Sequence, residues 1–278
     1  MDLNVLQTVF YGLLSGLMDI LPVSAQAHKV LFLKFFGIRE SSAVMELMIH
    51  LGIFAALFYS NQANLIRMNR ARSLARIPKK KRKRPLDVRS LMDWSLVKTM
   101  CIPAILGLLL YRYTEKLEKS FVLLSVFLFI NGVILYIPQF FPTGNRDSRT
   151  LSRVEGLLMG LAGAVSILPG FSAVGTSMSA ASVCGVERKY SLNMVLILNM
   201  VLSAGWMVYD ILDVFAGEFG YFSVGILIRY ILSAAAAFGG TMLGIAAVRK
   251  ITENQSFSLF GVYCWGVALF MFILNLIA

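Results

Sequence analysis

GLLSGLMDILPVSA at residues 12–25 and GLLMGLAGAVSILPGFSA at residues 156–173 are two versions of one pattern. Each begins with a Gly-Leu-Leu run, breaks at Pro22 or Pro169, and continues through small polar residues into a second short apolar run. Proline removes a backbone donor and interrupts a helix, so each stretch predicts two short helices with a break between them. Interrupted apolar segments at corresponding places in two halves of a chain indicate a binding site inside a membrane protein.

Composition indicates a protein that crosses the bilayer several times. Of the 278 residues, 58% are hydrophobic and only 15% are charged. Several apolar runs approach the ~20 residues that span a hydrocarbon core, and in lipid such runs must be helical to satisfy their own amides. The cysteines Cys101, Cys184 and Cys264 lie in apolar segments without metal-ligand spacing, which favours packing roles. The chain begins without a basic segment or an A-x-A-like cleavage site, so we expect no cleavable signal peptide.

We expect one membrane domain, residues 1–278, built from two repeats that are separated by the polar stretch 141–153. The first repeat, 1–140, consists of a hairpin, three spans and a basic loop, at 3–36, 41–60, 92–112, 120–140 and 61–91 respectively. The second repeat, 154–278, consists of a hairpin and three spans at 154–184, 191–213, 223–248 and 257–277. The arms of both hairpins are mostly too short to cross a bilayer alone.

Three crossings in each repeat give the two repeats opposite orientations, because three is an odd number. The sequence therefore predicts an all-α polytopic membrane protein with two inverted-topology repeats, six transmembrane helices and two re-entrant helical hairpins. In this arrangement the tips of the two hairpins meet near the middle of the membrane. Discontinuous helices of this kind line the substrate sites of many transporters.

The basic residues fit this topology. Eleven lysines and arginines and one acid, Asp87, lie between Arg67 and Arg89. Such a run can bind nucleic acid, but in a loop between two spans it is typical of a cytoplasmic loop that obeys the positive-inside rule. We therefore expect no nucleic-acid partner, and we expect the 67–89 segment to contact anionic membrane lipids.

Polar side chains that are unusual at membrane depth gather in three places. Those around the first break are Asp19, Ser24, Gln26 and His28, and those around the second are Ser172, Thr176, Ser177 and Ser179. Glu46 and His50 share one face of the span 41–60 because they are four residues apart. An ionisable residue inside a membrane is costly, which makes it a candidate for function. Asp210 and Asp213 lie at the end of a span, where we expect them to be solvated.

Each group also has a simpler interpretation. Serine and threonine hydroxyls in membrane helices commonly bond to backbone or to a neighbouring helix. Asp19, Glu46 and His28 also suit a buried structural network, and Glu46 with His50 forms half of a metal site. Arg229 lies deeper in its span, where it can reach the interface or form a pair.

The segments SGLMDILPVSAQAH (15–28) and PGFSAVGTS (169–177) resemble the two motifs of the undecaprenyl-pyrophosphate phosphatases of the bacitracin-resistance type. These motifs have the forms E-G-x-x-E-x-L-P-[VI]-S-S-x-G-H and P-G-x-S-R-S-G-x-T. The resemblance implies the architecture described above and a polyprenyl-pyrophosphate ligand in lipid-carrier recycling for the cell wall. It also implies a multi-pass protein of the bacterial plasma (inner) membrane with the loop 61–91 in the cytoplasm.

The chain departs from both motifs at residues that carry charge. Ser15 stands where the family has its first glutamate, and Ala173 stands where it has arginine. Smaller departures are Asp19 for a second glutamate, and Ala25, Ala27, Val174, Ser177 and Asn193 for other family residues. An arginine fork is well shaped to neutralise phosphate, and loss of one stabilising donor lowers a rate by about 100- to 1,000-fold. Lys29 or Arg188 are the candidates to replace the missing cation.

The resemblance implies roles for the residues that remain. As catalytic groups it implies Asp19, His28 and Ser172, and as substrate-binding groups Ser24, Gln26, Gly170, Ser177 and His50. Asp19 and Glu46 are the expected ligands for Mg²⁺ or Ca²⁺ in an active enzyme, and without activity we expect no cofactor.

Three functions remain open. The first is a polyprenyl-pyrophosphate phosphatase with impaired activity. The second is a non-catalytic relative that binds or flips a polyprenyl phosphate or another anionic lipid. The third is a scaffold or regulatory partner for cell-envelope enzymes. The sequence leaves the oligomeric state open, a homo-oligomer included.

Overall fold

The computed structural model describes residues 3–38, 41–217, 223–254 and 257–277. Across these ranges the chain forms helices and connections, with one isolated β-bridge between Arg146 and Val186 and no strand. Six helices are long and apolar enough to cross a membrane. They are α3 (Ala43–Ala75), α4 (Val88–Leu109), α6 (Phe121–Tyr136) with η3 (Ile137–Phe140), α9 (Arg188–Phe215), α10 (Val224–Asn254) and α11 (Ser258–Ile277). The prediction of an all-helical, multi-pass membrane protein is confirmed.

Two pairs of shorter helices contain the repeated pattern. The first pair is α1 (Val5–Ile20) and α2 (Ala25–Phe35), and the second is α7 (Arg153–Ala164) with η4 (Val165–Ile167) and α8 (Ala173–Val183). After each proline a serine restarts the chain as a helix, because its hydroxyl accepts a first-turn amide. Ser24 accepts from the amide of Ala27, and Ser172 accepts from the amide of Gly175.

The two breaks touch each other. The Ser172 hydroxyl donates to the carbonyl of Leu21 at 3.3 Å, which joins the restart of the second pair to the break in the first. Gly170 has a φ of +102°, and a Cβ there would lie 2.8 Å from the backbone nitrogen of Leu128 on α6. Only glycine fits this position. The inverted repeat and the re-entrant course of both pairs stay predictions from the sequence.

The glycines of the pattern explain how each first arm packs. Gly16 of α1 lies against the backbone of Ala237 on α10, and Gly160 of α7 lies against the backbone of Met100 on α4. A Cβ at either glycine would overlap a carbonyl oxygen of the neighbouring helix. Small residues allow this close approach, which stabilises helix pairs in lipid. These corresponding glycines of the repeated pattern therefore allow both first arms to pack against long helices.

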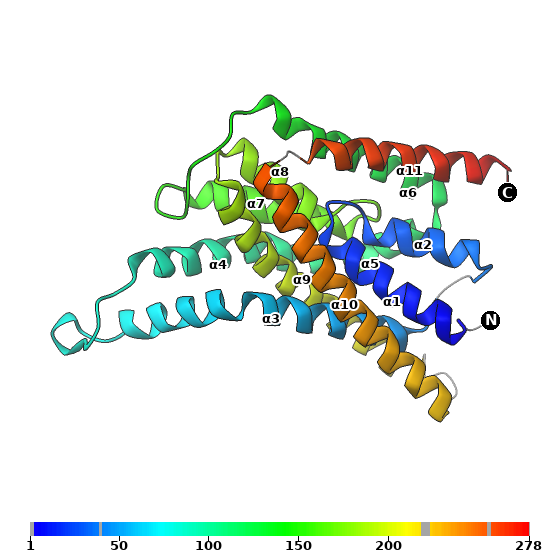
Figure 1. The fold of residues 1–278 in the computed structure, drawn as a ribbon, viewed down its shortest axis with the longest axis horizontal. Coiled ribbons are helices and arrows are strands. Elements are labelled where there is room, and N and C mark those ends of the chain that lie inside the picture. The colour runs from blue at the N-terminus through cyan, green and yellow to red at the C-terminus, as the bar shows by residue number, and fades with distance from the viewer. Residues whose placement is uncertain (1–2, 39–40, 218–222, 255–256, 278) are drawn as a thin grey trace.

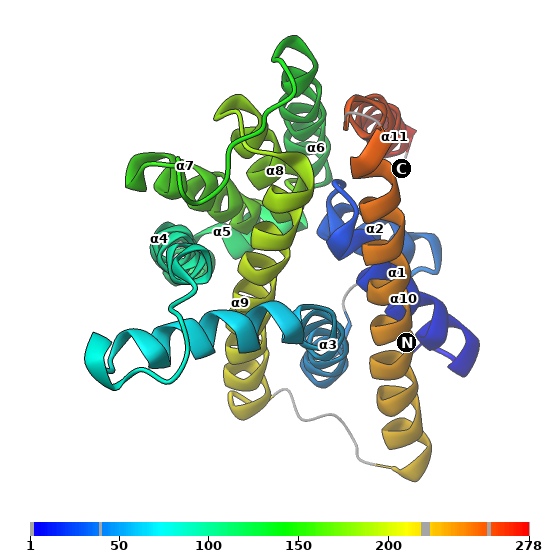
Figure 2. The same cartoon turned by 60° about the vertical axis from the view of Figure 1, so that its left-hand side comes forward.

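The remaining helices pack in pairs from opposite halves of the chain. α3 packs on α9 and α6 packs on α11, and α6 and α11 lie side by side in Figure 1. The turned view in Figure 2 shows α9 and α10 running through the bundle with α3 beside them. The two halves are thus interleaved, and the helix ends around the two breaks come together between them.

One segment differs from the sequence prediction. We expected residues 61–91 to form a loop, but α3 continues as a helix to Ala75, and 3₁₀-helix η1 (Lys79–Lys81) precedes α4. The residues from 61 to 75 contain no glycine or proline, and Asn61, Met68 and Ala71 are buried, so tertiary packing extends the helix. The extension and the start of α4 run out together beyond the other helices in Figure 1.

Candidate functional site

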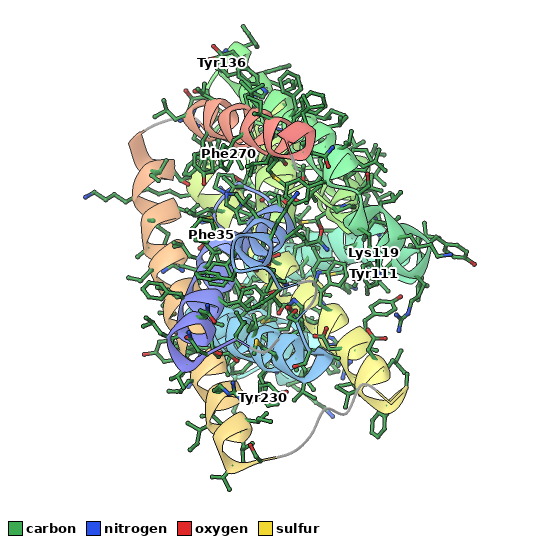
Figure 3. The ribbon with its side chains drawn as sticks, turned by 90° about the vertical axis from the view of Figure 1, so that its right-hand side faces the viewer. Phe35, Tyr111, Lys119, Tyr136, Tyr230 and Phe270 are labelled. Carbon is green, nitrogen blue, oxygen red and sulfur yellow. The ribbon has the colours of Figure 1, made fainter. Side chains whose placement is uncertain are left out.

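A cavity of about 780 Å³ lies where the two breaks meet. Its walls come from both halves of the chain: α1, α2 and α3 from the first, and the start of α8 and part of α9 from the second. The short helix α5 (Tyr111–Thr114) and 3₁₀-helix η2 (Glu115–Lys119) contribute Tyr111 and Lys119, which are labelled in Figure 3. A cavity at the junction of two broken helices is the expected place for a ligand in this kind of architecture.

Glu46 on α3 is the centre of one polar cluster in this cavity. Its carboxylate accepts from the Lys29 ammonium at 2.5 Å and from the Tyr11 hydroxyl at 2.6 Å, and Ser41 also donates to it. Side chains of Lys29 and Glu46 are 16% and 15% exposed, so the ion pair faces the cavity and is largely shielded from solvent. A charged pair in such a place is strongly coupled, because water screens it little.

Asp19 lines the same cavity from α1. Its carboxylate accepts a hydrogen bond of 2.7 Å from the amide of Asn199 on α9. This contact links the first broken pair to a long helix of the second half.

His50 and Asp210 form a second polar pair in the cavity wall. The Nδ1 atom of His50 lies 2.6 Å from Oδ2 of Asp210, and the two side chains are only 15% and 13% exposed. The expectation that Asp210 is solvated at a helix end is therefore wrong, because α9 places it against α3. Asp213, one turn further on, forms an ion pair with Arg112 on α5. The indole of Trp206 stacks near His50 with ring centroids 6.4 Å apart.

His28 does not line the cavity, although it completes the first motif. Its Nδ1 lies 2.6 Å from the carbonyl oxygen of Ser24, and its Nε2 lies 2.8 Å from the hydroxyl of Tyr263 on α11. A carbonyl only accepts, so Nδ1 carries the proton and Nε2 accepts from the tyrosine. Both ring nitrogens of His28 therefore have protein partners.

The other predicted site residues divide into two groups. Gln26 and Ser172 line the cavity. Ser24 is a buried helix cap, Gly170 packs on α6, and the Ser177 hydroxyl donates to the carbonyl of Met159 at 3.0 Å. Thr176 likewise bonds to the carbonyl of Ala162, and buried Ser179 has no hydrogen-bond partner within the described ranges. For Ser177 and Thr176 the geometry matches the simpler, structural interpretation.

The two substituted motif positions have different surroundings. Ala173 lines the cavity at the start of α8. Ser15 is buried, with its hydroxyl bonded to the carbonyl of Tyr11 at 2.7 Å, and it does not line the cavity. Loss of the motif arginine therefore changes the cavity directly, whereas Ser15 contributes to the packing of α1.

Three lysines line the cavity: Lys29, Lys34 and Lys119. Lys29 is one of the two candidates for a replacement cation, and the other candidate, Arg188, lies outside the cavity at the start of α9. Sequence reasoning missed Lys34, Lys119 and Asn199 because none belongs to a motif. The spacing of Lys34, eight residues after Gln26, is a signal that could have placed it on the same face of α2.

The donor set in the cavity does not fit a divalent cation. Among the described residues, no group of three or more His, Cys, Asp or Glu side chains could hold a metal ion. Of the two carboxylates expected as ligands, Glu46 is already neutralised by the ammonium of Lys29. An ammonium this close would repel a bound cation. No chemical step is therefore assigned to a metal here.

Sequence comparisons agree with the motif resemblance. A family model for bacitracin resistance protein BacA matches residues 8–270. An undecaprenyl-diphosphatase of Desulforapulum autotrophicum is 30% identical over 280 residues, covering 98% of this chain and 99% of that protein. An undecaprenyl-diphosphatase of Methanobrevibacter smithii is 28% identical over 276 residues, covering 97% of each chain. Undecaprenyl-diphosphatase 1 of Shouchella clausii is 26% identical over 98% of this chain and 96% of its own length.

Proposed function

The chain belongs to the bacitracin resistance protein family, and from this premise we propose that it binds a polyprenyl pyrophosphate in its cavity and hydrolyses it slowly. Its relatives are named undecaprenyl-diphosphatases, which supports a lipid pyrophosphate as the ligand. Membership of the family alone does not settle the rate, because Ala173 and Ser15 replace charged motif residues.

The observation that carries the proposal is the position of Lys29 in the cavity. The ammonium is held by Glu46 at 2.5 Å, so it is already fixed in place before a ligand arrives. If a phosphate shared this ammonium with Glu46, Lys29 would supply part of the positive charge that Ala173 no longer provides. A lysine neutralises phosphate as a point charge, whereas an arginine also orients it through two parallel bonds. Lys29 therefore supports binding of the headgroup better than it supports catalysis.

Two helix starts add to the anion site. Ala25 and Gln26 begin α2, Ser172 and Ala173 lie at the start of α8, and all four line the cavity. The first amides of a helix point outward without partners in the helix itself, and they favour negative charge. The headgroup would therefore meet two helix N-termini and a lysine at once.

The apolar part of the cavity suits the isoprenoid chain. Carbon-rich side chains line it from both halves of the protein: Met18, Val23, Val30, Leu33, Ile38, Phe121 and Phe171. A site with apolar walls and a few fixed polar groups is typical of small-molecule recognition. A cavity that combines charged groups with apolar walls suits a lipid with a charged head.

Slow hydrolysis follows from the state of the other motif residues. The Ser172 hydroxyl donates to the carbonyl of Leu21, and no histidine is its partner, so it lacks a base that would activate it. His28 uses both ring nitrogens within the protein. Without the motif arginine, charge that develops on phosphate is stabilised less well.

The alternative is binding or flipping of the same lipid without hydrolysis. Two observations favour this alternative. Both ring nitrogens of His28 already bond within the protein, and Glu46 is already paired with Lys29. Both residues therefore have protein partners in place of the catalytic and metal-binding roles that the motifs imply for them. In a protein that flips lipid, the contact between the two breaks would lie where the two halves of the chain meet.

The test uses purified full-length protein in detergent and farnesyl pyrophosphate as a soluble probe. Calorimetry would measure binding of the probe and of its methylene-bridged analogue, which cannot be hydrolysed. Phosphate release would be followed with protein in excess over probe. Binding with slow release supports the proposal, and binding without release supports the alternative. Absence of binding to either compound would refute both.

The basic extension supplies a separate lipid contact in this proposal. A groove of about 510 Å³ lies between the end of α3 and the connection to α4, with Arg67, Arg70 and Arg84 beside the apolar Ile66 and Leu74. We place this groove at the cytoplasmic surface of the plasma membrane, where it would hold an anionic headgroup.

A further inference from the structure

The chain contains two histidines, and their surroundings differ. Nε2 of His28 accepts a hydrogen bond from the Tyr263 hydroxyl, and His28 lies outside the cavity lining. His50 lies in the cavity lining, and its described polar side-chain contact is made by Nδ1. The Nε2 atom of His50 has no hydrogen-bond partner within the described part of the chain.

The contact with Asp210 fixes which nitrogen of His50 is basic. A carboxylate only accepts hydrogen bonds, so Nδ1 of His50 must donate its proton across the 2.6 Å contact. In the neutral ring the lone pair then resides on Nε2. A carboxylate in this position also stabilises the imidazolium that forms when Nε2 takes a proton.

We infer that His50, oriented by Asp210, is the general base for hydrolysis of a prenyl pyrophosphate in this cavity. The inference rests on the proposed function, and it assigns the residual chemistry to a residue outside both family motifs. His50 is the proposed catalytic residue, and Asp210 is a positioning residue because it acts through the imidazole.

The proposed phosphate site and the imidazole share one cavity. Glu46 and His50 are four residues apart on one face of α3, and Glu46 is the group that holds Lys29. Lys29 and His50 both line the cavity. In the proposed step, one water molecule lies between Nε2 and the phosphorus of a phosphate bound at Lys29.

The step balances without a further reactant. The water oxygen forms a bond to the terminal phosphorus while the bond from that phosphorus to the bridging oxygen breaks. The bridging oxygen keeps the electron pair and leaves as part of the prenyl monophosphate. The proton of the water passes to Nε2 of His50 and is later released to solvent or to the phosphate product.

Several other side chains that line the cavity can ionise: Tyr11, Asp19, Lys29, Lys34, Glu46, Tyr111, Lys119, Tyr209, Asp210 and Asp213. The pH profile of phosphate release therefore reports the whole cluster. The ring of Trp206 lies beside the imidazole, tilted 20° from it with the ring centroids 6.4 Å apart.

The experiment measures single-turnover release of phosphate from farnesyl pyrophosphate between pH 5 and 9 by the full-length protein. The variants are His50→Gln, His50→Ala, Asp210→Asn, His28→Gln and Glu187→Gln, and circular dichroism checks their helix content. Glu187→Gln is the matched control, since it removes a carboxylate at the start of α9, outside the cavity lining, and leaves the His50 contact intact.

We expect His50→Gln to lower the rate by ~100-fold or more and to remove its rise with pH, while affinity for the methylene-bridged analogue changes little. Asp210→Asn should lower the rate by ~10-fold or more and shift the pH profile, because the amide favours the wrong tautomer. In His50→Ala, added imidazole should restore part of the rate. His28→Gln and Glu187→Gln should show neither the pH effect nor rescue.

Two results would overturn the inference. One is a His50→Gln protein that hydrolyses the probe at the rate and with the pH profile of the unmodified protein. The other is an unmodified protein that binds the analogue but releases no phosphate, which would leave the binding proposal standing and remove the assigned base. Failure to bind either compound would remove the proposed function as well.

Discussion

The Nζ atom of Lys29 lies 2.5 Å from Oε2 of Glu46, so the cavity holds a lysine and a glutamate from different helices in one ion pair. Lys29 follows the motif histidine on α2, and Glu46 lies in the first turn of α3. The pair therefore places a lysine in the cavity that Ala173 also lines.

Substitution of Lys29 tests the replacement cation. Lys29→Met should weaken binding of the methylene-bridged pyrophosphate by ~10- to 100-fold, because a hydrogen bond to a charged group contributes about 1.5–3 kcal/mol. Calorimetry would measure the dissociation constant, with Lys29→Arg expected to retain much of the affinity. Lys98→Met, on an exposed position of α4, is the control for loss of one positive charge. Unchanged affinity in Lys29→Met would contradict the assignment.

Restoring the motif charges should have unequal effects. Ala173→Arg places a guanidinium in the cavity and should raise phosphate release by ~100-fold, which is the usual effect of one such donor. Ser15→Glu would bury a carboxylate among tightly packed helices, and it should lower thermal stability without increasing activity. Measurements of release and of melting temperature on both variants separate these effects. Equal gains from both substitutions would show that Ser15 also reaches the substrate.

The sequence was sufficient to predict the elements that surround the cavity, but not the rotation of α2 within them. The proline breaks and the apolar runs were enough to locate the helices. A proline interrupts a helix through the local backbone, and an apolar run reflects the lipid that surrounds a span, so both signals are present in the sequence itself. His28 and Lys29 are consecutive and therefore point about 100° apart on a helix, so the cavity receives one and α11 receives the other. The contact with Tyr263 on α11 determines that His28 faces α11 and Lys29 faces the cavity. A single sequence does not show that contact.

The same limit applies to long-range partners. Asp210 looked like a solvated helix end because the sequence shows only its neighbours on α9, whereas its partner His50 lies 160 residues away. Residues 61–75 looked like a loop because their charges dominate the pattern. Their packing partners on α4 extend the helix.

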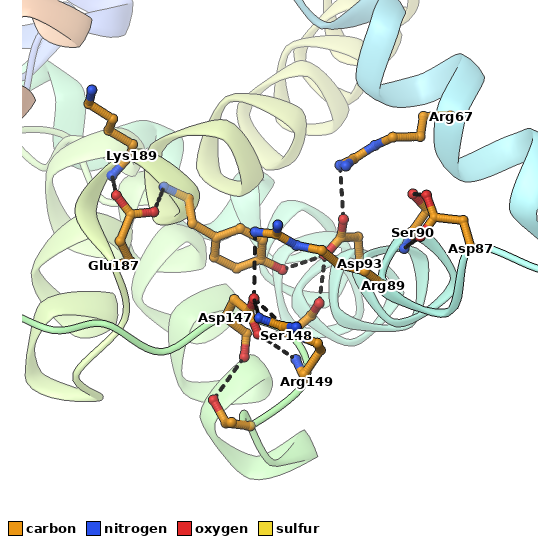
Figure 4. A network of polar contacts seen from close by, with 12 residues as sticks. Arg67, Asp87, Arg89, Ser90, Asp93, Asp147, Ser148, Arg149, Glu187 and Lys189 are labelled. Atoms are coloured by element: carbon orange, nitrogen blue, oxygen red, sulfur yellow. Dashed lines mark hydrogen bonds and ion pairs between the residues drawn. The ribbon is translucent and has the colours of Figure 1, made fainter.

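A buried acid outside the cavity should contribute strongly to stability. Asp93 on α4 is fully buried and accepts from Arg67 at 2.9 Å, from Ser148 at 2.6 Å and from Tyr190 at 2.8 Å (Figure 4). It joins the α3 extension, the connection before α7 and the start of α9. Asp93→Ala should reduce the free energy of unfolding by ~2–4 kcal/mol, as measured by titration with SDS in mixed micelles.

The matched variant for Asp93 is Asp87→Ala. Asp87 is the helix cap of α4 and accepts from the amide of Ser90, so its removal should reduce the free energy of unfolding by only ~1 kcal/mol. Equal effects of the two variants would show that the Asp93 network adds nothing beyond an ordinary cap.

The start of α7 should give stability a specific dependence on acid pH. The Arg146 guanidinium, bonded to Glu155 at 2.5 Å, lowers the pKa of that carboxyl from its ordinary value of 4.5 to about 2. Because the folded pKa is the lower one, this contribution is complete above pH 4.5 and is lost as pH falls towards 2. Glu155→Gln should lower the melting temperature at pH 7 and flatten its dependence on pH between 4.5 and 2. Arg146→Gln should flatten the same interval, and an unchanged slope in both variants would contradict the pairing.

The groove beside the α3 extension should select anionic lipids. Arg70 and Arg84 line it together with apolar side chains, and a basic residue near a membrane surface contributes about 1 kcal/mol to binding an anionic lipid. The double variant Arg70→Gln with Arg84→Gln should therefore reduce occupancy by phosphatidylglycerol by ~10- to 30-fold, measured by native mass spectrometry in detergent. Lys250→Gln, a basic residue outside the groove at the end of α10, should have a much smaller effect. The preference over phosphatidylcholine should also weaken as salt rises, because screening acts on exposed charges. Equal occupancy by the two lipids in the unmodified protein would show that the groove does not recognise charge.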